Sequence, residues 1–295
     1  MRESVSEPWV VLVDKPAGWT SHDVVAVARG ALSATRVGHA GTLDPFATGL
    51  LVLGVGRATR ILEYLVGLTK AYETRVFLGA ATDTLDPEGE RILEDDNWRG
   101  LGHDRLSGVL TGMTGRLMLT PPRYSAIKVG GVPAHRRVRR GEKVELPARD
   151  VTVHSMELLD VDLPEVRFRV ECSSGTYVRS LAAEYGRRLG TAAHLAALRR
   201  IRVGDFRVDR ASSVESLRTG QIPDRSRVGV GESLSHLERV EVDRGEAEML
   251  STGRRIRTEA RDASPVAFFL PGDELVAIGA VRDGVLEPRK VFRRV

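Results

Sequence analysis

The spacing of apolar positions changes along the chain, and each spacing predicts a different element. A continuous apolar run over residues 9–13 predicts a buried strand that stops at Asp14. Over residues 24–32 the apolar positions recur three and four apart, which predicts a helix that Thr20 and Ser21 can cap. Further along, the pattern predicts a glycine-rich loop over 38–49, a strand over 50–55, a helix over 61–66 ending at Gly67, and a strand over 72–78.

The second half of the chain shows the same two spacings. Apolar and charged residues alternate over 166–172, which predicts a strand, and Ser173-Ser174-Gly175 then forms a turn. Apolar positions at helical spacing predict a helix over 178–189, closed by Gly190. Residues 212–240 are polar, and we expect helix ends and a linker there. The last part predicts a strand-rich module with a short helix over 246–250 and strands around 266–270, 275–281 and 291–295.

Length and composition suit a globular α+β protein of two parts. Hydrophobic residues make up 42% of the 295 residues and charged ones 28%, so the chain can bury a substantial core. The length favours one large domain and one small domain. With the change of pattern near residue 240, we expect domains over 1–240 and 241–295.

Charge is distributed unevenly. The net charge is only +4, yet residues 123–149 hold eight Lys or Arg and two Glu, a local +6. Concentrated basic residues are what a phosphate-contacting surface needs, although a solvated charged loop is the commoner origin of such a run. With the flanking prolines, we interpret residues 121–149 as a long functional loop. Residues 81–105 are acidic and rich in turn residues, and we expect a surface excursion there.

Several classes of protein are excluded. Cys172 is the only cysteine, so an internal disulfide and a multi-cysteine zinc site are ruled out. The seven histidines lack the spacing of a metal site, and we expect no metal. No secretory signal and no apolar run of about 20 residues is present, so we expect a soluble, cytoplasmic protein. The run Leu53-Gly54-Val55-Gly56 is not followed by the residues of a phosphate-binding loop.

Asp44 is the first candidate for chemistry. It precedes Pro45, and a residue before proline is held in an extended or turn conformation. Gly38 and Gly41 let the nearby backbone approach a ligand closely. A carboxylate fixed on such a loop could act as a nucleophile or a base. Local composition alone favours the alternative, in which Asp44 caps a turn that reaches Thr48.

Arg179 and Tyr72 are the other candidates. Arg179 opens the helix after the Ser173-Ser174-Gly175 turn, where a guanidinium could cross a cleft and pair with a carboxylate. An exposed first-turn arginine is the commoner case. Tyr72 begins its strand and could stack on a nucleobase, and a core tyrosine is an equally good interpretation.

Six motifs in one order resemble the TruB family of pseudouridine synthases. They span about 200 residues: Asp14-Lys15-Pro16 with Gly18, Thr20 and Ser21; the run from Gly38 to Gly49; Lys70-Ala71-Tyr72; Pro121-Pro122 with Tyr124 to Lys128; Ser173 to Leu181; and His194-Leu195 with Leu198-Arg199-Arg200. Residues 241–295 resemble, more loosely, the small PUA-type RNA-binding module of that family.

The resemblance implies a fold and a reaction. The fold would be the pseudouridine synthase fold, a central mixed, mostly antiparallel sheet flanked by helices, followed by the β-rich PUA-like domain. The enzyme would be an isomerase without a cofactor that converts the T-loop uridine (position 55) of tRNA to pseudouridine. We expect a stand-alone bacterial type that acts on the tRNA T arm as a monomer, without an obligatory protein partner.

The resemblance also implies roles for single residues. Asp44 would attack or deprotonate the flipped nucleoside, Tyr72 would stack on the uracil, and Arg179 would pair with a buried Asp44 carboxylate. Leu198 would line the pocket, Tyr177 would bind substrate and His39 would fill the gap left by the flipped nucleotide. The loop residues expected to hold the RNA backbone are Arg123, Lys128, Arg136, Arg137, Arg139 and Arg140.

Two departures and two alternatives accompany this interpretation. Ala40 stands where the family often has a second glycine, and His135 replaces the usual aromatic after Ala134, so the basic loop should grip RNA more electrostatically. One alternative is an RNA-binding or tRNA-folding module in which catalysis is absent or secondary. The other is a related synthase that acts on another RNA, as the guide-RNA-dependent relatives of archaea and eukaryotes do. The sequence leaves open which atom Asp44 attacks, the oligomeric state and any RNA chaperone role.

Overall fold

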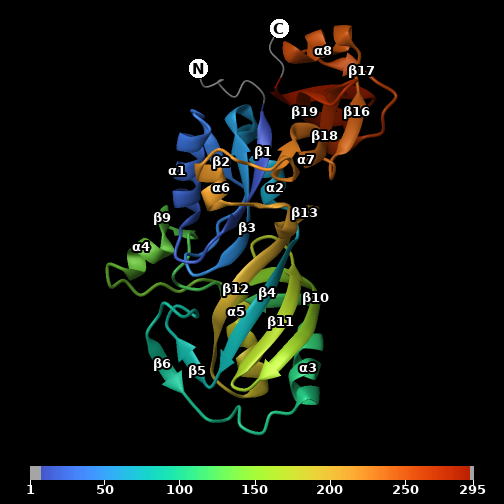
Figure 1. Cartoon of the computed structure of the whole chain (residues 1–295). Helices are drawn as coiled ribbons and strands as arrows, with labels where there is room; N and C mark the ends of the chain where they lie inside the picture. The colour runs from blue at the N-terminus through green and yellow to red at the C-terminus, as the bar shows by residue number, and fades with distance from the viewer. Residues whose placement is uncertain (1–7, 293–295) are drawn as a thin grey trace.

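An eleven-stranded sheet forms the centre of the computed structural model, which describes residues 8–292 (Figure 1). The order along the main path is β14-β1-β3-β12-β4-β11-β10-β7, with β2, β13 and β15 attached to β3, β12 and β1. Among the described residues of this sheet, the β1–β14 and β3–β12 pairs are parallel and the others are antiparallel, so the mixed, mostly antiparallel sheet is confirmed. The strands are β1 (Trp9–Lys15), β2 (Val37–His39), β3 (Thr48–Val55), β4 (Lys70–Leu78), β7 (Gly115–Leu119), β10 (Arg149–Asp162), β11 (Glu165–Cys172), β12 (Ala193–Val203), β13 (Phe206–Arg207), β14 (Ser212–Ser213) and β15 (Arg227–Gly229).

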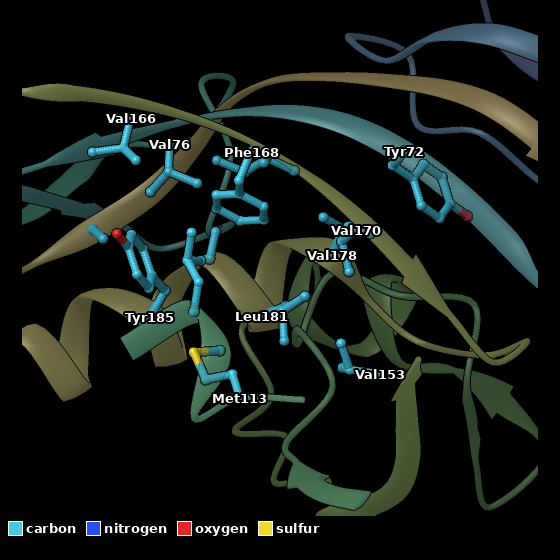
Figure 2. Close-up of a cluster of buried hydrophobic side chains, with 14 of the residues drawn as sticks. Tyr72, Val76, Met113, Val153, Val166, Phe168, Val170, Val178, Leu181 and Tyr185 are labelled. Carbon is cyan, nitrogen blue, oxygen red and sulfur yellow. The ribbon is translucent and has the colours of Figure 1, made fainter. Parts of the chain in front are cut away.

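Helices α3 and α5 cover one face of the half of the sheet that is formed by β4, β11, β10 and β7 with the start of β12, which is the lower half in Figure 1. The inward side chains of β11 pack against α5, whose apolar stripe includes Leu181 and Tyr185 (Figure 2). Tyr185 donates a hydrogen bond to the Leu106 carbonyl on α3, so its hydroxyl is satisfied inside the core. Gly190 ends α5 at φ 86°, as expected from the sequence. The bounds are α3 (His103–Thr111) and α5 (Val178–Leu189).

The upper half is built around β1 and β3. Helices α1 and α6 cover one face, and α2 covers the other. Thr20 caps α1 in a reciprocal capping box with Asp23, whereas Ser21 bonds elsewhere. The bounds are α1 (Ser21–Ala31), the 3-10 turn η1 (Gly56–Arg60), α2 (Leu62–Val66), η2 (Val208–Arg210), α6 (Val214–Arg218), η3 (Asp224–Ser226) and α7 (Val230–Ser233).

The C-terminal part forms a second sheet of five strands with helix α8. Phe269, Ile278 and Phe292 join the same apolar cluster as Leu62 and Leu65 of α2, so the small module packs directly on the larger part. The β-rich module is confirmed, and we propose that the two parts divide close to residue 238. The bounds are β16 (Glu238–Glu241), α8 (Arg244–Ser251), β17 (Ile256–Arg257), β18 (Ala263–Leu270), β19 (Glu274–Arg282) and β20 (Val285–Val291).

Two expectations about loops need correction. Residues 212–240 are not a linker, because β14 and β15 within them pair with β1. The segment 121–149 carries β8, β9 and α4 and has a small apolar core of its own at Ala134, Val144 and Leu146. Short strands held by backbone hydrogen bonds leave little trace in a polar sequence. The bounds are β8 (Lys128–Val129), β9 (Val132–Pro133) and α4 (Ala134–Val138).

The last strand and the acidic excursion also differ from expectation. The final strand expected at 291–295 lies earlier, as β20, and residues 293–295 lie outside the described residues. The acidic stretch 81–105 contains most of a hairpin of β5 (Ala80–Thr82) and β6 (Arg91–Glu94). Its hairpin turn is not a free surface loop, because Asp86 within it is buried.

Candidate active site

A pocket of about 680 Å³ opens between the two halves of the sheet. Its walls come from the 41–45 loop, the start of β4, the 84–88 turn, residues 124–126, the 173–179 segment and β12. These segments are far apart in the sequence. The pocket therefore exists only in the folded chain, at the point where β3 leaves β12.

Glycine makes the approach of β3 to β12 feasible. Gly49 adopts φ +101°, and a Cβ there would lie 2.3 Å from the backbone oxygen of Arg200. No side chain fits in that space. The two strands pair in parallel at Arg199↔Thr48 and Arg200↔Gly49, which brings the 41–47 loop against β12.

Three buried or nearly buried side chains hold the backbone of the Asp44 loop. Lys15 donates to the Pro45 carbonyl at 3.1 Å and also to Pro16 and Trp19. The hydroxyl of Ser21 accepts from the Leu43 N–H at 2.9 Å. Arg200, which is 1% exposed, donates to Leu50, Thr42 and Gly41. Hydrogen bonds to side chains from three elements thus hold the loop backbone.

Burial changes the pKa of Lys15, one of the three side chains that hold the loop. Burial lowers the pKa of Lys15 to about 8, although the nearby Asp44 carboxylate opposes the shift. Its three acceptors are neutral carbonyls. Lys15 therefore supports the loop mainly by hydrogen bonds.

Arg179 stands between two carboxylates at the base of the pocket. Its Nε lies 3.1 Å from Oδ2 of Asp44, and its NH1 donates to Asp86 at 2.9 Å. The Nε contact is ionic, since this nitrogen makes no hydrogen bond. The guanidinium also donates to the carbonyls of Thr84 and Tyr124 at 3.1 Å. The arginine is thereby held in one orientation, with its side chain 5% exposed.

The Asp44 carboxylate is less buried than the sequence suggested. Its side chain remains 35% exposed because it lines the open pocket. Burial raises the pKa of Asp44, the Arg179 charge lowers it, and the Asp86 charge raises it again. The alternative role as a turn cap receives no support, because both Asp44 carboxylate oxygens face Arg179.

Of the other candidate substrate residues, three line the pocket and one does not. Tyr72 and Leu198 are each 8% exposed, and Tyr177 precedes the first turn of α5. His39 lies on β2 outside the pocket lining, with its ring 5.7 Å from that of His22 in an edge-on contact. Its buried Nδ1 has no hydrogen-bond partner, and burial lowers its pKa.

The basic segment reaches the pocket at one end. His135 donates from Nδ1 to the Ser125 carbonyl, 2.9 Å away, and so ties α4 to the pocket wall. Arg139 lines the pocket, whereas Arg137 forms an ion pair with Glu142 at 2.5 Å. The remaining loop candidates are exposed and lie outside the pocket lining: Arg123, Lys128, Arg136 and Arg140.

Sequence reasoning missed several residues that build the site. Asp86 was assigned to a surface excursion, although it forms an Asp-Pro pair with Pro87 just as Asp44 does with Pro45. That repeated dipeptide is the signal that could have found it. Arg200 and Lys15 were quoted in motifs without a role, because burial of a charged side chain cannot be read from spacing.

The site has the parts for covalent or base chemistry by a carboxylate. Asp44 is fixed, charged and faced by an oriented cation, which is what such a group needs. Within residues 8–292, no group of three His, Cys, Asp or Glu side chains could hold a metal ion. In the same range no helix has the length and apolarity needed to span a membrane.

The chain is similar to known proteins over almost its whole length. A family model described as TruB family pseudouridylate synthase (N terminal domain) matches residues 29–178. The tRNA pseudouridine synthase B of Thermobifida fusca (strain YX) is 44% identical over 293 residues, covering 96% of this chain and 98% of that protein. The protein of the same name from Leifsonia xyli subsp. xyli (strain CTCB07) is 45% identical and covers 91% of each chain.

Solved structures show the same fold. A chain from a Cbf5-Nop10-Gar1 complex matches with a TM-score of 0.75 and 25% identity, covering 97% of this chain and 85% of that chain. A chain of the archaeal box H/ACA sRNP Nop10-Cbf5 complex matches with a TM-score of 0.74 and 23% identity, covering 97% and 86%. The fold expected from the sequence resemblance is confirmed.

Proposed function

The chain belongs to the TruB family of pseudouridylate synthases, and we propose that it converts the T-loop uridine at position 55 of tRNA to pseudouridine. The observation that carries the proposal is the Asp44 carboxylate, fixed on its loop and paired with Arg179 in a pocket with room for a nucleoside. The relatives named tRNA pseudouridine synthase B supply the substrate class.

The pocket accepts a base only after that base has left its stack. Unstacking costs a few kcal/mol, which contacts in the pocket must return. Tyr72 offers a ring at the pocket wall for stacking, and Leu198 offers an apolar contact. Tyr177 contributes to the same wall, and His39 is proposed to fill the space that the flipped nucleotide leaves in the RNA.

Asp44 then acts on the nucleoside. The glycosidic C–N bond breaks, the base turns, and a carbon of the base forms a C–C bond to the same ribose carbon. That base carbon loses its proton and the released ring nitrogen gains one, so no atom is gained or lost overall. A carboxylate can assist by attack or by proton abstraction, and it must be ionised in both cases. Bound RNA excludes water from the pocket and would raise the pKa of Asp44 further, which Arg179 opposes.

The basic segment and the C-terminal module complete the RNA contact. We propose that the exposed basic residues of 123–149 neutralise phosphates around the T arm. The five-stranded module packs on α2 and lies at the end of the molecule opposite the β5–β6 hairpin (Figure 1). We propose that it binds the stem beyond the loop.

One substitution tests the function. Asp44→Asn keeps the size of the side chain and removes its negative charge. We expect no pseudouridine in tRNA by mass or chemical mapping, with tRNA affinity within a few-fold of wild type. Product formed by this variant would refute the assignment. Wild-type protein alone should also modify a T-arm minihelix, and inactivity without a guide RNA would contradict a stand-alone enzyme.

A further inference from the structure

A third carboxylate stands at the mouth of the pocket. Glu88 lines the pocket together with Asp44 and Arg179, but its residue is exposed. It lies in the turn between β5 and β6, on the same side of the molecule as α4 (Figure 1), whose His135 lines the same pocket. The sequence placed this residue in a surface excursion and gave it no role.

The turn that carries Glu88 is rigidly built. Asp86 Oδ1 accepts the Glu88 N–H at 3.0 Å and the Thr84 hydroxyl at 2.6 Å, while its Oδ2 holds Arg179. At Gly89 a Cβ would lie 2.2 Å from the Thr84 hydroxyl oxygen, so the turn closes tightly behind Glu88. The same carboxylate therefore fixes both the catalytic arginine and the backbone of Glu88.

The Glu88 carboxylate has no partner of its own. Asp44 and Asp86 both contact Arg179, whereas the side chain of Glu88 makes no hydrogen bond or ion pair to any residue in 8–292. Partial burial raises the pKa of Glu88, and the charges of Asp86 and Asp44 add to the effect. A carboxylate that stands beside a binding pocket on a fixed backbone, without a donor of its own, is suited to a donor on the substrate.

Charge divides the mouth of the pocket into two rims. Glu88 lies on the rim formed by the β5–β6 turn, while Arg139 and His135 line the pocket from α4. A phosphate is attracted by the arginine and repelled by the glutamate. A strand crossing the mouth is therefore expected to turn its phosphates toward α4 and its bases or ribose edges toward Glu88.

We infer that Glu88 is a specificity residue that accepts a hydrogen bond from an N–H or O–H donor of the RNA at the pocket mouth. The inference rests on the proposed function. Two sources carry such donors: the amino and imino groups of bases next to the target uridine, and ribose 2′-hydroxyls. Phosphates carry none, and they are excluded as the group that Glu88 recognises.

The first experiment compares Glu88→Gln and Glu88→Ala with a matched control, Glu90→Gln. Glu90 is exposed in the same turn and lies outside the pocket lining. On a T-arm minihelix we expect both Glu88 variants to lose about tenfold in kcat/KM, mainly through KM, because a charged acceptor makes the stronger hydrogen bond. The control should stay within twofold, and all three should keep the wild-type melting temperature.

The second experiment identifies the donor. Minihelices are prepared with one change each: a 2′-deoxy sugar at the target or a neighbour, or a base near the target that lacks one amino or imino group. The donor that Glu88 accepts should cost wild type about tenfold and cost Glu88→Ala less than twofold. A deoxy sugar with this behaviour assigns the ribose, and a base change assigns the base.

Additive losses for every RNA change, or full activity of both Glu88 variants, would overturn the inference. So would a Glu88→Gln variant that only binds every RNA more tightly, since this result would reduce Glu88 to simple repulsion. The proposed function fails separately, if wild type forms no pseudouridine on the unaltered minihelix.

Discussion

Removing the charge of Asp86 tests the two-carboxylate arrangement around Arg179 most directly. Asp86 is buried, with its side chain 5% exposed, and it accepts from Arg179, Thr84 and the Glu88 backbone. Breaking a buried ion pair by removing one partner costs about 3–5 kcal/mol. Because Arg179 keeps Asp44 and two carbonyl acceptors, we expect Asp86→Asn to lose about 3 kcal/mol, the lower end of that range.

Calorimetry should show the loss of stability, and the pH dependence of activity should show the loss of the Asp86 charge. For a chain of 295 residues, about 3 kcal/mol corresponds to a fall in melting temperature of roughly 5 °C, because the entropy of unfolding grows with chain length. The Asp86 charge also raises the pKa of Asp44. Its removal should move the acid limb of the kcat/KM profile to lower pH, while the maximal rate falls because Arg179 is less firmly oriented.

Glu90→Gln serves as the control, since it changes an exposed carboxylate of the same turn. It should leave the melting temperature within about 1 °C. An Asp86→Asn protein with unchanged stability would show that the Arg179–Asp86 contact contributes little. An acid limb that moves to higher pH would refute the electrostatic part of the reasoning.

Three further predictions concern the supports of the site and its RNA contact. Gly49→Ala should destabilise by more than about 3 kcal/mol in urea unfolding, because φ is +101° and a β12 carbonyl fills the space, whereas Gly18→Ala, with open space, should cost about 1 kcal/mol. Replacing the four arginines within 136–140 by Gln should lower the salt slope of tRNA binding by about 2–3 rather than 4, since Arg137 has an ion pair of its own; an unchanged slope would mean that the segment is only a solvated face. Burial holds the pKa of Lys15 near 8 in the folded chain, against 10.5 for an ordinary lysine. Between about pH 8 and 10.5 the unfolded chain therefore binds one more proton at this residue, and the free energy of unfolding should rise with pH. Melting curves of Lys15→Met should lack the part of that rise that comes from Lys15.

Much of the fold follows from local patterns, because those patterns reflect one buried face. Strand β11 alternates because α5 covers only one of its sides, and α5 ends at Gly190 because its C-cap requires a left-handed residue. The sequence failed where backbone hydrogen bonds alone decide the structure. Strands β14 and β15 are short and polar, and only their pairing with β1 shows that they belong to the sheet.

The candidate site divides in a similar way. Asp44, Tyr72 and Arg179 could be named from the sequence because their motifs occur in a fixed order, and their roles remain predictions. Asp86 could not, because its burial depends on a hairpin that brings an acidic turn against α5. Residues 81–105 contain eight Asp or Glu residues, and the sequence alone does not show that Asp86 is buried while others of the eight are exposed.

The position of Arg179 explains why these parts belong together. One guanidinium contacts the Asp44 loop, the β5–β6 turn through Thr84 and Asp86, and the start of the basic segment through the Tyr124 carbonyl. These contacts use all three nitrogens of one planar group, which a lysine could not reproduce. We therefore expect a displacement of the basic segment by bound RNA to change the orientation of the arginine and, through it, that of the Asp44 carboxylate. On the proposed function, this single side chain would couple RNA contact to the geometry of the site.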